Sequence, residues 1–382
     1  MSRLRSAARQ LAASVRDAGP LWTASLIADR LLPLGILGAW PDRTVMPDAL
    51  AGQLEAILRA WGMAPEHVAI TVRHILYADL HGIDSHGASM LLDYHRRRLA
   101  GALTMTPAIG VVRETAATAL VDGGGGLGHV PADVAMRLAI AKCGAGGIGA
   151  VAVRNSGHFG AAGAYTAMAA EAGYVGIATT NTREPAVVPT HGAEAKLGTN
   201  PIAFGAPAAR NPPFMLDMAT STASVGKVTT AWRRGRSIPA GWALDPRGKA
   251  VTSGRLAAKY RRLTPLGATA AMGSHKGYGL AAAVEILSAV LPGRGGVGHF
   301  FLALDPACFR AHGSFAEDLD VLLDGLRTCA PIDAAEPVRV AGDPEQAAHA
   351  ARRRDGIPVS RSVIEDLRTV ARATGVPFTL AP

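Results

Sequence analysis

Apolar residues recur at three- and four-residue intervals through the first part of the chain, from Met46 to about Met105. This spacing is typical of amphipathic helices. One such helix, with apolar positions from Val68 to Leu76, is expected to end before Gly82. Another is expected to begin around Asp84-Ser85-His86, where Ser or Asp can act as the cap, and to end at Gly101. The segment therefore predicts a mainly helical unit.

A different pattern follows between Ala108 and about Pro207, where short β-type runs alternate with helices rich in small residues. Such alternation predicts an α/β layer structure. The polar, Pro/Gly-punctuated stretch from Thr229 to Ser274 then predicts loops and a small subdomain, and helices are expected again at Lys276 to Leu291 and after Ala335. The clearest β-type runs are Ala117 to Asp122, Gly149 to Arg154 and Val175 to Thr180.

Residues 1–45 differ from the rest because they are rich in arginine and poor in acids. Gly19-Pro20 separates a predicted basic helix from an apolar helix that runs through Leu31. Starts of this kind occur in transit peptides and in membrane-surface helices. We favour the simpler interpretation, a helical extension that packs on its own enzyme or on a second subunit.

The composition narrows the class of protein. Of 382 residues, 49% are hydrophobic and 18% charged, so two or three packed lobes are feasible. The net charge is +9, yet no basic stripe is interleaved with aromatic residues, so anionic small molecules are a better expectation than nucleic acid. Cys143, Cys308 and Cys329 form no CxxC pair, which fits a reducing cytoplasm. No window of about 20 apolar residues is free of charge or proline, so no membrane span is expected.

The run Gly123 to Gly128 matches GxGxxG, follows apolar residues and precedes a predicted helix at Pro131 to Cys143. In a Rossmann domain this loop would place a pyrophosphate on the helix N-terminus. A ribose-binding acid should then end the next strand, but the run Val151 to Val153 ends in Arg154-Asn155. We therefore favour a structural turn over a Rossmann loop.

The sequence Asp84-Ser85-His86-Gly87 stands at the expected start of a helix, where free backbone N–H groups favour an anion. A histidine there can exchange a proton with a substrate oxygen, and Ser85 can orient its ring. A Ser-His pair at a cap is also common as a purely structural feature. No HExxH, CxxC pair or carboxylate cluster supports a metal site. Four further polar, glycine-rich segments are weak signals when taken singly: Asn155 to Ala162, Leu197 to Pro201, Leu216 to Ser221 with Gly226-Lys227 behind it, and His275 to Gly279.

In this order and at these spacings, the motifs together resemble the malate, L-sulfolactate and ureidoglycolate dehydrogenase family, which also includes lactate dehydrogenases, diketogulonate reductases and cyclic-imine reductases. The resemblance covers about Leu54 to Val376. It implies a homodimeric α/β enzyme of L-sulfolactate-dehydrogenase-like fold, with a non-Rossmann nicotinamide-binding domain at residues 108–319 and one helical lobe formed by residues 46–107 and 320–382. The motifs that carry the resemblance are Gly82 to Gly87, Asn155 to Gly160, Leu197 to Pro201, Asp217 to Ser221, Lys276 to Gly279, Gly298 to Phe301 and Arg354 to Pro358.

The resemblance also implies hydride transfer between the nicotinamide of NAD or NADP and C2 of a small 2-oxo or 2-hydroxy acid derivative or a cyclic imine. Ser85 and His86 resemble the proton-relay pair, whereas some members use the histidine at the His158 position as the acid/base, so both histidines stay open. Lys227 falls near the relay, where some members carry an acid. The implied cofactor contacts are His158, Phe159, Gly160, Thr182, Leu216, Asp217, Met218, Ala219, Lys276, Gly277, Gly342 and Asp343.

One position departs from the family pattern. Members generally carry an arginine four residues after the histidine of Ser-His-Gly, and here that residue is Met90. In a helix the side chain of residue 90 should share a face with His86, where an arginine would hold a substrate carboxylate through two charge-assisted hydrogen bonds. Methionine makes no such bonds and predicts an apolar, adaptable pocket.

Three explanations of Met90 stay open. In the first, the substrate lacks the usual carboxylate and is an amide, a thioester or a larger cyclic imine or ketone. In the second, Arg183, in the loop Asn181 to Pro185, binds the carboxylate instead. In the third, catalysis is lost and the chain is a dimeric binding or scaffold protein. Thr199 is a further expected substrate contact. Retention of Ser85 and His86 favours an active reductase with an altered substrate range.

Overall fold

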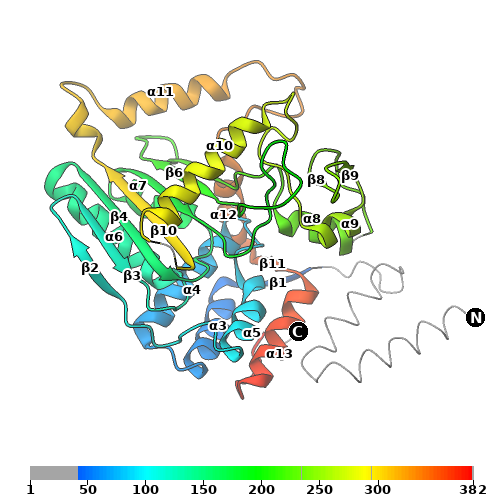
Figure 1. The fold of residues 1–382 in the computed structure, drawn as a ribbon. Helices are drawn as coiled ribbons and strands as arrows, with labels where there is room; N and C mark the ends of the chain where they lie inside the picture. Colours follow the sequence, from blue (N-terminus) through cyan, green and yellow to red (C-terminus); the bar gives the residue numbers. More distant parts are fainter. Residues whose placement is uncertain (1–41, 234, 294, 381–382) are drawn as a thin grey trace, which may run out of the picture.

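The computed structural model describes residues 42–380, except residues 234 and 294. They form a helical lobe, a sheet domain and a small subdomain (Figure 1). The predicted helical extension lies outside the described residues over 1–41, whereas Arg43–Val45, which was assigned to it, is a strand, β1. In this described part, no helix is long and apolar enough to cross a membrane.

The helical lobe combines the beginning and the end of the chain (Figure 1). Its apolar faces form one buried core, in which Leu54 and Ile57 from the first part are joined by Leu367 and Val370 from the last. The prediction of a mainly helical lobe built from both chain ends is confirmed. Its elements are α3 (Pro47–Ala60), α4 (Pro65–Leu80), α5 (Leu91–Leu99), α12 (Asp343–Asp355) and α13 (Arg361–Ala373), with β1 antiparallel to β11 (Ile357–Val359).

The sheet domain contains a seven-stranded sheet in the order β2-β3-β4-β10-β5-β6-β7. Within it, β3 and β4 run parallel and all other neighbours run antiparallel. A Rossmann domain has a mostly parallel sheet, so the prediction of a non-Rossmann α/β domain is confirmed. The strands are β2 (Gly110–Glu114), β3 (Thr118–Asp122), β4 (Ile148–Ser156), β5 (Val175–Thr180), β6 (Ile202–Ala206), β7 (Phe214–Met218) and β10 (Val297–Leu304).

Helices pack against both the sheet and one another. Small residues such as Ala139 and Ala169 allow α6 and α7 to approach the strands closely, and both are fully buried. These helices are α6 (His129–Gly146), α7 (Gly163–Glu171) and α10 (Ser274–Glu285), which a π-helical turn continues at Ile286–Val290.

The stretch from Thr229 to Ser274 was expected to hold loops and a small subdomain, and the structure agrees. Val187, Ile238 and Leu263 belong to a separate buried cluster of this subdomain. Its elements are α8 (Val225–Arg233), β8 (Ala243–Leu244), β9 (Ala250–Val251) and α9 (Gly254–Tyr260).

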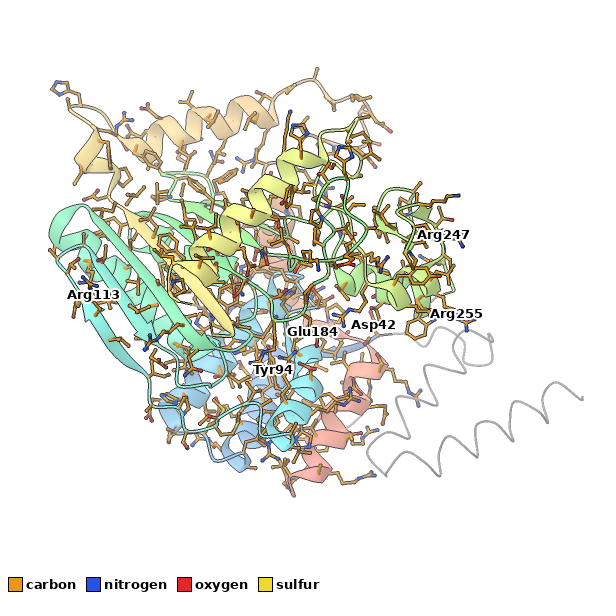
Figure 2. All side chains as sticks on the ribbon, in the orientation of Figure 1. Asp42, Tyr94, Arg113, Glu184, Arg247 and Arg255 are labelled. Carbon is orange, nitrogen blue, oxygen red and sulfur yellow. The ribbon has the colours of Figure 1, made fainter. Side chains whose placement is uncertain are left out.

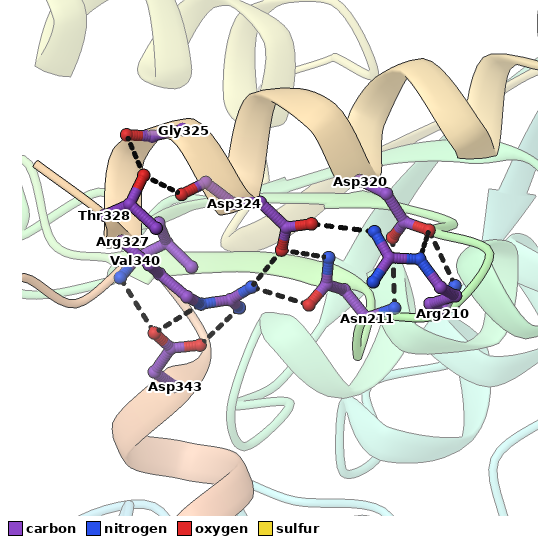
Figure 3. A network of polar contacts seen from close by, with 9 residues as sticks. All are labelled: Arg210, Asn211, Asp320, Asp324, Gly325, Arg327, Thr328, Val340 and Asp343. Carbon is purple, nitrogen blue, oxygen red and sulfur yellow. Dashed lines mark hydrogen bonds and ion pairs between the residues drawn. The ribbon is translucent and has the colours of Figure 1, made fainter.

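A polar network holds α11 (Phe315–Arg327) against the rest of the protein (Figure 3). The helix follows a 3-10 turn at Pro306–Phe309. The buried Asp320 carboxylate accepts hydrogen bonds from the main-chain amides of Arg210 and Asn211, at 2.8 and 3.0 Å, in the connection between β6 and β7. Arg327 then pairs with Asp343 at 2.7 Å, at the start of α12. The boundary expected at residue 320 falls inside α11, which contacts the connection between β6 and β7.

The helix expected to begin at Asp84 begins seven residues later, and that prediction is wrong. Turns occupy residues 84–87, a 3-10 turn follows at Ala88–Met90, and α5 starts at Leu91. The physical reason is local: the buried carboxylate of Asp79, at the end of α4, accepts a hydrogen bond from the Ala88 amide at 2.8 Å. This bond, together with the non-helical ψ of Gly87 (−141°), holds the chain out of a helical path.

Candidate active site

Two imidazole rings from different parts of the fold meet at the junction of the lobe and the sheet domain. His86 lies in the turn that follows α4, and His158 follows β4. Their rings stack with centroids 5.4 Å apart and planes inclined by 24°. Both side chains are half-buried, and the exposed Ser85 places its Oγ 2.8 Å from Nδ1 of His86. The two histidines that the motifs indicated are therefore neighbours.

Tyr94 is a third residue of this site, and the sequence analysis did not predict it. The residue lies on α5, is fully buried, and places its hydroxyl 2.7 Å from Nδ1 of His158. Figure 2 shows it between the helical lobe and the sheet domain. A tyrosine within the predicted helix, two turns after His86, was the available signal, but its partner lies 64 residues away in the sequence.

Hydrogen bonds also determine which ring nitrogen of His158 carries the proton. The main-chain N–H of Gly160, which can only donate, lies 3.3 Å from Nδ1 of His158, so this nitrogen accepts and the neutral ring carries its proton on Nε2. Burial lowers the pKa of His158 well below 6.5, and a charge on His86 would lower it further. Burial also lowers the pKa of His86. Both rings are thus neutral at pH 7.

A close contact fixes glycine at position 87. A Cβ built on Gly87 would lie 1.9 Å from Oδ1 of Asp79, well inside van der Waals contact. Burial raises the pKa of the Asp79 carboxyl to about 7, although its hydrogen bond from Ala88 opposes the rise. Any side chain at position 87 would therefore clash with the buried Asp79 carboxyl, and this contact restricts the conformation of the turn that carries His86.

Among the described residues, Lys227, Arg183 and Thr199 form no hydrogen bond or ion pair with His86 or His158. Gly226, at the start of α8, comes within 3.7 Å of Ser85 when a Cβ is built on it, and the adjacent Lys227 side chain is exposed. Arg183 is exposed as well, and Thr199 contributes its carbonyl to hydrogen bonds from Thr220. These placements leave the roles of Lys227, Arg183 and Thr199 as predictions.

Met90 does not follow the geometry that the sequence suggested. Residues 86 to 90 form turns and a 3-10 turn, so the rule that residues four apart share a helical face does not apply between His86 and Met90. The Met90 side chain is half-buried and packs against the core of the helical lobe. Tyr94, four residues further on, is the residue from this segment that reaches His158.

Several predicted cofactor contacts lie on β7 or directly after it. Asp217 accepts a hydrogen bond from the main-chain amide of Gly163 at 2.7 Å, where α7 begins. Its side chain is reached by solvent, yet the surrounding protein raises the pKa of its carboxyl to about 6, with Glu345 adding to the rise. Leu216 and Met218 flank it on β7, with Ala219 directly after the strand, and all three are half-buried.

For other predicted cofactor contacts, the structure limits which atoms are available. Phe159 is buried and stacks on His299 with centroids 4.5 Å apart, and its carbonyl accepts a hydrogen bond from the Tyr165 hydroxyl at 2.6 Å. Gly160 has a positive φ of 77°. Gly277 packs α10 against the backbone of Leu266, since a Cβ would lie 2.3 Å from that carbonyl oxygen. Of the remaining four, three show no restriction of this severity: Thr182 is half-buried, Lys276 is exposed and Gly342 has a φ of 102°. Asp343 is held by Arg327 (Figure 3).

The glycine run forms a structural turn. A Cβ on Gly128 would lie 2.2 Å from the Gly157 carbonyl oxygen, and one on Gly126 would lie 2.6 Å from Pro107. The Gly123 and Gly128 amides donate to the carbonyls of Arg154 and His158, so they are not free for a phosphate. The run thus packs the start of α6 against the loop that carries His158.

Comparison with known proteins agrees with this architecture. The model of the malate/L-lactate dehydrogenase family matches residues 45–368. A malate dehydrogenase of Pyrococcus horikoshii is 37% identical over 87% of this chain and 96% of its own, and an L-sulfolactate dehydrogenase of Methanocaldococcus jannaschii is 35% identical over 84% and 94%.

Solved structures give the same result. Malate dehydrogenase from Entamoeba histolytica superposes with a TM-score of 0.84 at 32% identity, covering 88% of this chain and 99% of that one. The delta1-piperideine-2-carboxylate reductase from Pseudomonas syringae gives a TM-score of 0.77 at 28% identity, with 86% and 100% covered. The chain belongs to the malate/L-lactate dehydrogenase family and is an oxidoreductase of the dehydrogenase type. Dehydrogenases of this family use nicotinamide cofactors.

The residues present fit such a cofactor. A solvent-reached carboxylate at Asp217 suits a ribose hydroxyl, and the buried Gly160 lies beside the turn of His86, whose carbonyl oxygen is 3.8 Å from a Cβ built on that glycine. Over residues 42–380, leaving out 234 and 294, no group of three His, Cys, Asp or Glu side chains is arranged to hold a metal ion.

Proposed function

We propose that this protein transfers a hydride between NAD(H) or NADP(H) and C2 of a small 2-oxo or 2-hydroxy acid derivative or a cyclic imine, with His86 exchanging the proton. The bound nicotinamide supplies or accepts the hydride. The observation that carries the proposal is the stacked pair of His86 and His158, each with a hydroxyl partner at Nδ1.

His86 suits proton exchange better than His158 does. It is half-buried beside the exposed Ser85, and its lowered pKa leaves a neutral ring that can take a proton from an alcohol at pH 7. His158 holds its proton on Nε2, because Gly160 donates to the other ring nitrogen. It is therefore suited to donate a hydrogen bond to the substrate oxygen or nitrogen. Lys227 directly follows Gly226, the residue of α8 that approaches Ser85, so we propose that its ammonium group supplies positive charge to the same site.

Position 90 motivates our proposal for the substrate class, although its side chain packs against the helical lobe and shares no helical face with His86. Met90 offers no charge to a carboxylate, so we propose substrates whose binding depends less on such a contact, namely amides, thioesters or cyclic imines and ketones. A structural neighbour is named a reductase of delta1-piperideine-2-carboxylate, a cyclic imine that carries a carboxylate, so it supports the cyclic-imine class but not a substrate without a carboxylate. Arg183 is our second candidate for binding a carboxylate, because it is exposed and its guanidinium has no ion-pair partner among the described residues.

We also propose a homodimer. Large apolar side chains are exposed on α10, its π-helical continuation and α11. A surface of this kind suits association with a second copy. The three free cysteines support our proposal of a cytoplasmic location. The apolar residues concerned are Tyr278, Ile286, Val290, Leu291, Val321, Leu322 and Leu326.

The test begins with cofactor binding. Purified protein is titrated with NADH and with NADPH by fluorescence, and a panel of 2-oxo acids, amides and cyclic imines is then screened by the absorbance of the reduced nicotinamide. We expect binding of at least one dinucleotide and turnover of at least one panel compound. Absence of binding of both dinucleotides at millimolar concentration would overturn the proposal.

A further inference from the structure

Arg352, near the end of α12, reaches the turn that carries His86. One guanidinium nitrogen of Arg352 donates to the main-chain carbonyl of Asp79 at 2.6 Å and forms an ion pair with the carboxylate of Asp84. The other guanidinium nitrogen lies 3.4 Å from the second oxygen of Asp84. Arg352 and Asp84 are 268 residues apart in the chain, and the Arg352 side chain is only 16% exposed.

The turn needs such support because it has no regular secondary structure. Its internal hydrogen bonds are few: the Ile83 amide donates to Ala78 at 2.8 Å, and the His86 amide donates to Ile83 at 2.9 Å. Gly82 has a φ of 78°, and a Cβ there would lie 3.3 Å from Ala348 on α12. The turn is therefore enclosed between α4 and α12.

We propose that Arg352 is a positioning residue, which fixes the turn so that Ser85 and His86 are presented to the reacting atoms. The planar guanidinium suits this role, since it holds two acceptors at a set angle and stays charged at all working pH values. The proposal rests on the function proposed above, because it assigns Arg352 to the orientation of the His86 imidazole.

α12 also begins near the predicted cofactor side of the site. Its first residue, Asp343, is held by Arg327, and Gly342 precedes it (Figure 3). The helix has 13 residues, which at 1.5 Å each spans about 20 Å. One rigid element thus connects the loop at Gly342 with the turn at His86, and Arg352 is the contact at the turn.

The test compares Arg352→Met, Arg352→Ala and Asp84→Asn with Arg353→Met. Arg353 is the neighbouring, exposed arginine on the same helix, so its replacement removes the same charge without touching the turn. For all three variants at positions 352 and 84 we expect kcat to fall about ten- to a hundred-fold, since misplacement by about 1 Å can cost that much. The Kd for the dinucleotide should change less than twofold, and Arg353→Met should match the unaltered protein.

Guanidinium rescue separates positioning from simple loss of stability. Millimolar guanidinium chloride should restore part of the turnover of Arg352→Ala, but not that of His86→Ala. A folded Arg352→Met with kcat within twofold of the unaltered protein would overturn the proposal. Should that variant not fold, a folded Asp84→Asn with full turnover would overturn it equally. Full turnover by His86→Ala would instead contradict the proposed function, so the two failures are distinguishable.

Discussion

The hydroxyl of Tyr94 lies 2.7 Å from Nδ1 of His158, across the boundary between the helical lobe and the sheet domain. Tyr94 is fully buried on α5, and His158 follows β4 in the sheet domain. A buried ring nitrogen without a partner is costly, so this bond both orients the imidazole and connects the two units. The docking of the lobe on the sheet domain therefore determines the geometry of the site.

Replacing Tyr94 with Phe tests this relationship. The variant leaves Nδ1 of His158 with only the weaker bond from the Gly160 amide at 3.3 Å. We expect the free energy of unfolding to fall by about 1 kcal/mol. We also expect kcat to fall about tenfold, equivalent to roughly 1.4 kcal/mol of transition-state stabilisation. Equilibrium denaturation and steady-state kinetics measure the two effects. Tyr174→Phe, which removes a hydroxyl at a half-buried position near Gly144, should leave both values near those of the unaltered protein.

Met90→Arg tests the altered substrate range. Residue 90 is half-buried, so an introduced arginine can extend its charged end towards solvent or the site while its stem stays packed against the lobe. We expect kcat/KM to rise at least tenfold for simple 2-oxo acids and to stay unchanged for uncharged substrates. Met90→Leu is the matched control, because it keeps the apolar volume. Equal kcat/KM values for both variants on 2-oxo acids would show that carboxylate binding is determined elsewhere.

The buried His129 predicts a loss of stability in acid. It is fully buried, both ring nitrogens lack a hydrogen-bond partner among the described residues, and burial lowers its pKa to about 3. In the unfolded chain a histidine takes up a proton near pH 6.5. Between these two values the unfolded state binds more protons, so the free energy of unfolding must fall as pH falls from about 6.5 towards 3.

His129→Leu should reduce this dependence on pH. Urea denaturation at pH 6.5 and at pH 4.5 gives the difference in unfolding free energy, and we expect that difference to be smaller in the variant. A residual slope should remain, since His299 has its pKa lowered by burial to about 3 as well. The exposed His312 serves as the control, and His312→Leu should leave the slope unchanged. Identical slopes in the two variants would contradict the account of His129.

Much of the fold could be predicted from the pattern of the chain. The runs at 117–122, 149–154 and 175–180 became β3, β4 and β5, because hydrophobic periodicity reports directly on a buried strand. The missing acid after Val153 correctly favoured a non-Rossmann sheet. The Ser-His-Gly and Asn155 to Gly160 motifs named both histidines of the stacked pair, although nothing in their spacing revealed that they would stack.

The remaining features depend on contacts between distant residues. The start of α5 was placed too early because the carboxylate of Asp79 holds the Ala88 amide, a contact that helix-capping patterns do not include. Tyr94 was missed because its role depends on how α5 faces the sheet domain. The buried position of Phe159 likewise follows from its stacking on His299, 140 residues further along the chain. Such contacts become visible only in three dimensions.

The most direct test of the central claim is the turnover of His86→Ala, measured beside its dinucleotide binding. We expect kcat to fall by roughly a hundredfold or more, as for the loss of a general acid/base, while the Kd for the dinucleotide stays within twofold. In the unaltered protein, kcat for reduction should also decline as pH rises, because the pKa of His86 is lowered and its protonated form becomes scarce. A His86→Ala variant that turns over at the unaltered rate, with the same pH profile, would contradict the assignment of His86.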